Sequence, residues 1–145
     1  NPKTLVSQKF CNSIKMKLFV YGTLIFDEIL SKLLGKNHAS IPGLLENYKI
    51  KKFNNAEFPG IVKDATSNVL GKIILDINDH DTSILDTYDG VMYKRIILKV
   101  KTISNEYGCQ VYVVDDYYKR KLSEEAWCPL EFRHKYLNNY IKNLN

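Results

Sequence analysis

The sequence predicts an α+β fold in which a mixed, barrel-like β-sheet is flanked by helices. Three observations lead to this class: about six strand-like segments, short connections between them, and no regular alternation of strand and helix. The chain has 145 residues, of which 45% are hydrophobic and 26% charged, the composition of an ordinary globular domain. We therefore expect an N-terminal extension over residues 1–15 and a single domain over residues 16–145.

A strand, a turn and a helix are expected to open the domain. Lys17–Tyr21 (KLFVY) has the apolar pattern of a buried strand, and Gly22-Thr23-Leu24 follows as a turn. Residues 27–34 then begin with two acids and are followed by Gly35, which are start and stop signals of a helix.

Two strands and an intervening loop come next. Tyr48, Ile50 and Lys52 alternate with more polar neighbours, as in a strand with one wetter face, whereas Val69–Ile77 is a denser, more buried strand. Residues 54–60 combine Asn, Pro and Gly, so a loop is predicted between the two strands.

The second half of the chain predicts a helix, a hairpin and a terminal helix. Asn78 or Asp81 can cap a helix that runs toward Tyr88 and ends at Gly90. Two strands and the turn between them follow: Tyr93–Val100, Gln110–Val114 and Asn105–Gly108. A last helix is expected from near Pro129, because its apolar side chains keep helical spacing, and it should pack across the sheet.

The composition excludes several classes of function. The net charge is +5, but only three of the 21 cations are Arg and the Lys residues are scattered, so no nucleic-acid partner is predicted. No apolar segment approaches the roughly 20 residues of a membrane span, and a secretory signal is absent, so we expect a soluble, cytoplasmic protein without a membrane partner. Three widely spaced Cys and three His form no ligand pattern, which predicts reduced thiols, no metal and no cofactor.

Two carboxylates are candidates for proton transfer. Asp86 and Asp89 are three residues apart at the end of a predicted helix, where the negative end of the helix dipole favours their protonated forms. The alternative is structural, because Asp-Gly is a common turn dipeptide and both acids could be solvated or paired with Lys94 or Arg95.

The turn Tyr21–Leu24 (YGTL) is a candidate anion site. A tight turn between a strand and a helix presents backbone N–H groups that suit a carboxylate or an oxyanion. The alternative is ordinary turn chemistry, since Gly commonly follows a strand.

Six segments taken together resemble the gamma-glutamyl cyclotransferase-like family. The resemblance is closest to the branch that includes gamma-glutamylamine cyclotransferases and the plant avirulence-induced proteins. It covers positions 16–141 and rests on the order and spacing of Tyr21–Leu24 (YGTL), Glu57–Val62 (EFPGIV), Val69–Ile77 (VLGKIILDI), Leu85–Arg95 (LDTYDGVMYKR), Gln110–Asp115 (QVYVVD) and Trp127 with Glu131–Ile141 (EFRHKYLNNYI).

This resemblance implies a fold, an activity and a set of site residues. The fold is a cyclotransferase barrel with a cavity between the YGTL turn and the helix that carries LDTYDG. The activity is transferase- or lyase-like: the substrate's α-amine attacks its own γ-glutamyl carbonyl and releases 5-oxoproline and an amine, without a cofactor. The partner would be a small γ-glutamyl compound, bound by Tyr21, Gly22, Thr23, Leu24, Tyr93 and Tyr112, with Asp89 as the catalytic acid and base. An oligomeric state is not implied.

Asp89 also marks the main departure from the family, which has Glu at this position. Asp is shorter by one methylene, and a displacement of about 1 Å can cost about 100-fold in rate. Two functions are therefore carried forward: an active cyclotransferase, and a protein that keeps the pocket for binding without turnover. An Asp89 carboxyl that is buried against the YGTL turn with a raised pKa favours the enzyme, whereas a solvated carboxyl paired with Lys94 or Arg95 favours the binding protein.

Overall fold

The computed structural model describes residues 15–144, and five β-strands within them close into a barrel. The strands are β1 (Met16–Val20), β2 (Ser40–Lys52), β3 (Pro59–Ile77), β4 (Tyr93–Lys101) and β5 (Glu106–Val114). Their order around the barrel is β1-β3-β2-β4-β5, with β1 and β5 parallel and the other pairs antiparallel. The predicted mixed, barrel-like sheet is confirmed, while nearly all of the predicted extension over residues 1–15 lies outside the described residues.

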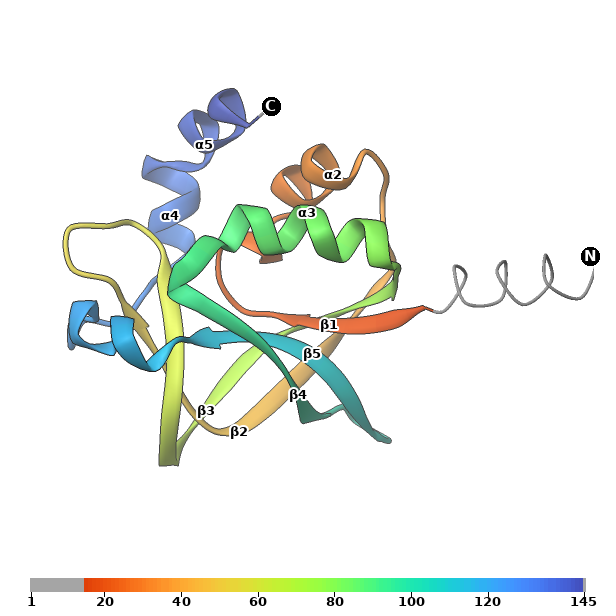
Figure 1. Cartoon of the computed structure of the whole chain (residues 1–145), viewed down its shortest axis with the longest axis horizontal. Coiled ribbons are helices and arrows are strands. Elements are labelled where there is room, and N and C mark those ends of the chain that lie inside the picture. Colours follow the sequence, from red (N-terminus) through yellow and green to blue (C-terminus); the bar gives the residue numbers. More distant parts are fainter. Residues whose placement is uncertain (1–14, 145) are drawn as a thin grey trace, which may run out of the picture.

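Four helices lie on one side of the barrel (Figure 1). They are α2 (Asp27–Leu34), α3 (Asp79–Asp89), α4 (Pro129–Lys135) and α5 (Leu137–Asn143). Three short 3₁₀ turns connect helices and strands: η1 (Thr23–Ile25), η2 (Gly90–Met92) and η3 (Asp116–Lys121). η2 follows α3 directly, whereas Tyr21 and Gly22 separate η1 from the end of β1.

The long hairpin β2–β3 allows the barrel to close. β2 and β3 have 13 and 19 residues, and their register shifts between Glu46 and Tyr48, where Asn47 has a φ of 67°. Such a bulge bends a strand, which lets one hairpin edge reach β1 and the other reach β4. At Gly71, a Cβ atom would collide with the carbonyl oxygen of Val20, so β1 can approach β3 this closely only beside a glycine.

α3 is held firmly at its N-terminus. The side chain of Asn78 accepts a hydrogen bond of 2.8 Å from the Asp81 amide, and the Asp81 carboxylate accepts one of 3.2 Å from the Asn78 amide. This reciprocal pair is a capping box, which satisfies two amides that the helix itself leaves unpaired. The helix ends at Asp89, and Gly90 then takes a φ of 75° that favours glycine.

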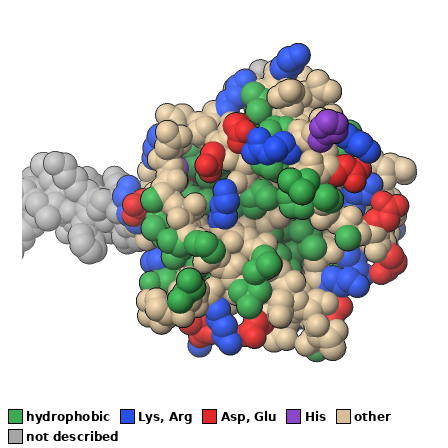
Figure 2. Space-filling view, turned by 180° about the vertical axis from the view of Figure 1, so that it is seen from behind, with side chains coloured by type: hydrophobic (Ala, Val, Ile, Leu, Met, Phe, Trp, Pro, Cys, Tyr) green, Lys and Arg blue, Asp and Glu red, His purple; other side chains and the backbone are tan. Residues whose placement is uncertain are grey.

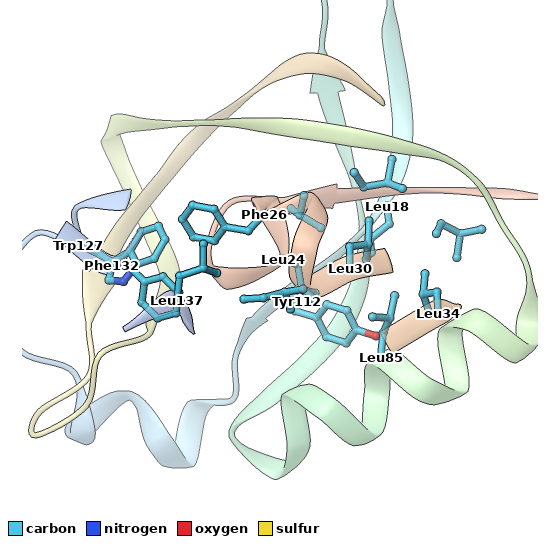
Figure 3. Packing of buried hydrophobic residues seen from close by; sticks show 14 residues of the cluster. Leu18, Leu24, Phe26, Leu30, Leu34, Leu85, Tyr112, Trp127, Phe132 and Leu137 are labelled. Carbon is cyan, nitrogen blue, oxygen red and sulfur yellow. The ribbon is translucent and has the colours of Figure 1, made fainter. Parts of the chain in front are cut away.

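Two apolar clusters form the core. One fills the barrel and is built from Phe19, Tyr21, Leu45, Tyr48, Ile61, Val69, Ile73, Val100, Cys109, Val111 and Val113. The other lies between the barrel and the helices and includes Phe26, Leu30, Leu85, Tyr112, Trp127, Phe132 and Leu137 (Figure 3). Within it, the rings of Phe26 and Phe132 stack at 5.4 Å, and the indole N–H of Trp127 donates to the Glu57 carbonyl at 2.7 Å. This second cluster holds α4 and α5 against η1 and α2.

Four predicted elements differ from the structure. The strand predicted around Tyr48–Lys52 begins at Ser40, because pairing with β3 extends it. The strands number five among the described residues, because β3 continues without a break from Pro59, inside the predicted loop 54–60, to Ile77. The β4–β5 turn lies at 102–105 instead of 105–108, because the Thr102 amide bonds the Asn105 carbonyl at 2.8 Å and pairing resumes at Glu106.

The predicted C-terminal helix is also interrupted. Tyr136, with φ −126° and ψ −20°, separates α4 from α5. The two helices pack beside α2 instead of across the sheet, since Arg133 pairs with Glu28 at 2.9 Å and Lys32 donates to the Ile141 carbonyl at 2.7 Å. The break at Tyr136 therefore lets both short helices follow the surface of α2.

The surface carries both signs of charge. On the face seen in Figure 2, Lys and Arg side chains are interspersed with Asp and Glu. Within residues 15–144, none of the helices has the length and hydropathy needed to cross a bilayer. Cys109 and Cys128 are free thiols, as expected, and Cys11 lies outside the described residues.

Candidate functional site

A cavity lies where β1 and α3 end. Its volume is about 340 Å³ including the part open to solvent. The lining residues are Phe19, Val20, Tyr21, Gly22, Thr23, Leu24, Phe58, Pro59, Asp89, Tyr93 and Tyr112. All seven site residues predicted from the sequence are among them, brought together from β1, η1, α3, β4 and β5, although their chemical roles remain predictions.

The YGTL turn forms one wall of this cavity. The Tyr21 hydroxyl donates to the Tyr112 carbonyl at 2.6 Å, which ties the end of β1 to β5. The first amides of a helix have no acceptor within it, and among the described residues no backbone carbonyl outside η1 accepts from Thr23 or Leu24. The turn therefore has backbone donors available beside the cavity.

Space around Gly22 is tight. Its φ is −107°, so the left-handed conformation is not the reason for a glycine here. A Cβ atom at this position would lie 3.0 Å and 3.2 Å from two ring carbons of Pro59, which also lines the cavity. A side chain at Gly22 would therefore press against Pro59.

Asp89 provides the carboxylate of the cavity. It is the last residue of α3 and partly buried, and no hydrogen bond or ion pair to its side chain exists within residues 15–144. Burial raises the pKa of Asp89 to about 7, and the negative charge of Asp86 adds to the rise. Near neutral pH this carboxyl can therefore both accept and donate a proton.

Tyrosine hydroxyls surround the carboxylate. Tyr93 donates to the Pro59 carbonyl at 2.6 Å, and the hydroxyls of Tyr88 and Thr23 are 2.8 Å apart. Burial raises the pKa of Tyr88 to about 12 and that of Tyr93 further still, and the charge of Asp89 raises both. These phenols stay neutral at physiological pH, so they act as hydrogen-bond partners.

Asp86 has a different environment from Asp89. Arg95 donates to its two carboxylate oxygens at 2.9 and 3.2 Å, and the Tyr112 hydroxyl donates at 2.6 Å. Burial alone would raise the pKa of Asp86, but the hydrogen bonds from Arg95 and Tyr112 outweigh it and the pKa is lowered. Of the two acids considered from the sequence, Asp86 is thus the ion-paired one and Asp89 the unpaired one.

Sequence reasoning missed part of this site. Tyr88 was assigned only to the apolar face of its helix, and Phe58 and Pro59 only to a loop or motif, although all three surround the cavity or its turn. The signal that could have found them is that all three lie inside EFPGIV and LDTYDG, two of the segments on which the family resemblance rests. The described residues contain no group of three or more His, Cys, Asp or Glu arranged to hold a metal ion.

Comparisons with known proteins agree with this fold. A family model described as gamma-glutamyl cyclotransferase, AIG2-like, matches residues 18–129. Two curated relatives from Arabidopsis thaliana, protein AIG2 C and AIG2-like protein C, are 26% identical over 88 residues and 29% identical over 94 residues. These matches cover 61% and 65% of this chain and 53% and 55% of the relatives, so the chain spans about half the length of the curated relatives it matches.

Solved structures share the same architecture. An Arabidopsis thaliana protein determined in solution aligns with a TM-score of 0.70 at 21% identity, covering 89% of this chain and 79% of that one. A structure named gamma-glutamyl cyclotransferase aligns with a TM-score of 0.64 at 19% identity, covering 91% of this chain and 89% of that one. A mouse AIG2-like protein aligns with a TM-score of 0.67 at 19% identity, covering 83% of this chain and 92% of that one. At these identities the likeness concerns the fold. Since the family model spans most of the chain, and the barrel and the motif order agree with it, this chain belongs to the AIG2-like gamma-glutamyl cyclotransferase family.

Proposed function

We propose that the protein is a γ-glutamyl cyclotransferase that converts a γ-glutamyl compound into 5-oxoproline and a free amine. The observation that carries this proposal is the Asp89 carboxyl, which lines the same cavity as the YGTL turn, has no hydrogen-bond or ion-pair partner within residues 15–144 and has a pKa of about 7. A general acid and base works best when its pKa is near the working pH. A carboxyl with its ordinary pKa of about 4 would be almost fully ionised at neutral pH, so it would be a weaker base and would rarely hold the proton that it has to return.

The reaction needs one proton shuttle. The α-amine nitrogen attacks the γ-carbonyl carbon while the Asp89 carboxylate takes a proton from that nitrogen. The resulting tetrahedral intermediate collapses with cleavage of the bond between the carbonyl carbon and the leaving nitrogen, to which Asp89 returns the proton. The five-membered lactam and the free amine are the only products, so atoms and charge balance without another reactant.

Two parts of the cavity would orient the substrate. The free amides of Thr23 and Leu24 suit the substrate's α-carboxylate, and Tyr93 and Tyr112 line the same cavity. Because nucleophile and electrophile belong to the same molecule, correct positioning removes much of the entropic barrier to ring closure. Donors placed toward the developing oxyanion lower the remaining barrier.

The substrate class is suggested by one local feature. Only Val91 and Met92 separate Gly90 from Tyr93, and this short acidic motif resembles the branch that acts on γ-glutamylamines more than those acting on glutathione or γ-glutamyl amino acids. We therefore propose a γ-glutamylamine as the preferred substrate.

The decisive experiment measures 5-oxoproline release over a panel of γ-glutamylamines, γ-glutamyl amino acids and glutathione. Asp89→Asn keeps the shape of the side chain and removes its titratable group, so turnover should fall by about 100-fold or more. Asp89→Glu restores the family's residue and should retain or raise turnover. Asp79→Asn, an exposed substitution on the same helix, is the matched control and should leave turnover unchanged.

Two results would contradict this assignment. Wild-type turnover that survives Asp89→Asn would place the proton shuttle elsewhere, with Asp86 the next residue to test. A wild type inactive on every substrate, combined with an active Asp89→Glu variant, would identify a pocket kept for binding without turnover.

A further inference from the structure

A second hollow lies at the other face of the β4–β5 hairpin. It has a volume of about 680 Å³ including its open part. Its lining residues are Tyr48, Ile61, Val62, Lys63, Lys94, Ile96, Val113, Val114, Asp116 and Lys119, and we call it the lysine cleft. It shares none of these residues with the cavity that contains Asp89.

The strand pairing explains why the wall of the barrel leaves a hollow here. β2 pairs with β4 only at Leu44 and Lys101, so the outer half of the β2–β3 hairpin diverges from β4 and β5 without backbone hydrogen bonds between them. Successive side chains of a strand point to opposite faces. Tyr93 and Tyr112 therefore line the first cavity, while their neighbours Lys94 and Val113, which are register partners, line the lysine cleft.

The cleft combines an apolar floor with a cationic rim. Ile61, Ile96 and Val113 lie on the floor, and Lys63, Lys94 and Lys119 are exposed around it. Lys119 pairs with Asp116 at 2.8 Å, whereas within residues 15–144 Lys63 and Lys94 form no ion pair. The hydrogen bond from Lys119 lowers the pKa of Asp116, and the charges of Lys119, Lys94 and Lys63 add to this effect. All four residues line the same cleft, so its charged groups are three cations and one anion.

Tyr48 adds a polar group to the cleft. Most of the residue is buried, with 7% exposed, but its hydroxyl is open to the cleft and has no hydrogen-bond partner among the described residues. A hydroxyl of this kind can donate to a bound anion. Burial raises the pKa of Tyr48, and the charge of Lys119 acts in the opposite direction. A phenolic donor and an ammonium donor therefore both line the cleft.

We propose that the lysine cleft is a second binding site, which takes a small organic anion with an apolar body and a carboxylate or phosphate head. The head lies among Lys63, Lys94 and the Tyr48 hydroxyl, and the apolar body lies along Val62 and Ile96, the partly exposed apolar residues of the cleft. Volumes of this order suit small organic ligands, whose affinity comes from apolar burial and whose orientation comes from a few polar groups. The site is independent of the proposed cyclotransferase reaction.

The test is an NMR titration of the ¹⁵N-labelled full chain with octanoate, octyl phosphate and 1-octanol. Both anions should shift the amides of Tyr48, Ile61, Ile96 and Val113 in a saturable manner, and the preferred head group is the one with the lower Kd. The neutral alcohol should bind at least about 10-fold more weakly, since it gains nothing from the lysines.

Variants separate a defined site from general surface binding. Lys63→Gln combined with Lys94→Gln should weaken anion binding at least about 10-fold, and Tyr48→Phe by a smaller factor of about 3. Lys99→Gln, an exposed lysine on the same strand outside the cleft, should have no effect. Equal affinity for octanol, equal loss in Lys99→Gln, or shifts only at residues around Asp89 would each overturn the proposal, whether or not 5-oxoproline is released.

Discussion

At the scale of single residues, Asp89 combines a chemical use with an energetic penalty. Its pKa is about 7, while an unfolded chain gives Asp its ordinary value near 4. The folded state therefore holds this proton more tightly. The free energy of unfolding is therefore highest, as far as Asp89 is concerned, below about pH 4. It falls as the pH rises toward 7, because the folded protein must then hold a buried charge.

Replacing Asp89 by Asn should consequently stabilise the protein in alkaline solution. The gain should be on the order of a few kcal/mol at pH 8 and should shrink toward zero near pH 4, where both states of the wild type bind the proton. Thermal unfolding followed by circular dichroism at the two pH values measures this difference. If the Tm of Asp89→Asn differed from that of the wild type by the same amount at both pH values, the substitution would not act by removing a buried charge.

Asp86 and Arg95 should set the pH profile of the site in opposite directions. The charge of Asp86 helps to raise the pKa of Asp89, and Arg95 partly neutralises that charge through two hydrogen bonds. Asp86→Asn should therefore move the midpoint of the kcat/KM profile to lower pH, and Arg95→Gln to higher pH, each by about half a unit to one unit. A ¹³C titration of the Asp89 carboxyl checks the same shifts without turnover. Shifts of the same sign in both variants would contradict this electrostatic coupling.

At the scale of secondary-structure elements, the YGTL turn depends on a close approach. Gly22→Val would place its side chain against the Pro59 ring, 3.0 Å from the Cβ position, and push both walls of the cavity apart. We expect a folded protein that no longer binds 5-oxoproline, measured by calorimetry with circular dichroism as the check on folding. Gly108→Val is the control, because the nearest atom there is 3.6 Å away, an ordinary contact. Full binding by Gly22→Val would remove this turn from the site.

The elements also show where sequence patterns suffice. α2 has the predicted bounds, because its first-turn acids and the left-handed Gly35 after its last turn are local signals. β3 was predicted too short because Pro59 and Gly60 are loop signals, and only their pairing with Lys52 and Lys51 of β2 makes them part of a strand. Local sequence signals thus predict elements whose ends are set by capping residues, such as α2. They miss strand residues that are extended only because a neighbouring strand pairs with them.

At the scale of the whole molecule, closure of the barrel depends on contacts between distant segments. Gly71→Ala would place a methyl group against the Val20 carbonyl, so β1 would have to move away from β3. We expect destabilisation of about 2 kcal/mol or more in urea unfolding, together with weaker ligand binding, since β1 leads directly into Tyr21. Gly108→Ala, in an open position, should change the unfolding free energy by less than about 0.5 kcal/mol. Similar values for the two variants would mean that β1 is free to adjust.

The composition of the site was predictable to the extent that its residues belong to recognisable segments. Tyr21, Asp89, Tyr93 and Tyr112 could be named from motif order, and the structure places them around one cavity. The sequence could not predict which of Asp86 and Asp89 is ion-paired, because the pairing depends on Arg95 of β4 and Tyr112 of β5, which both contact Asp86. Such differences in environment arise only when the barrel brings strands and helix together.

The alternation along β4 and β5 has a consequence for how this chain can evolve. Tyr93 and Lys94 are adjacent in the chain but face different hollows, as do Tyr112 and Val113. Insertion or deletion of one residue within either strand would exchange the two faces and damage both hollows at once. Changes in length are therefore tolerated best at the hairpin tip, residues 102–105, whereas substitutions at Tyr93 and Tyr112, or at Lys94 and Val113, alter the lining of one hollow only.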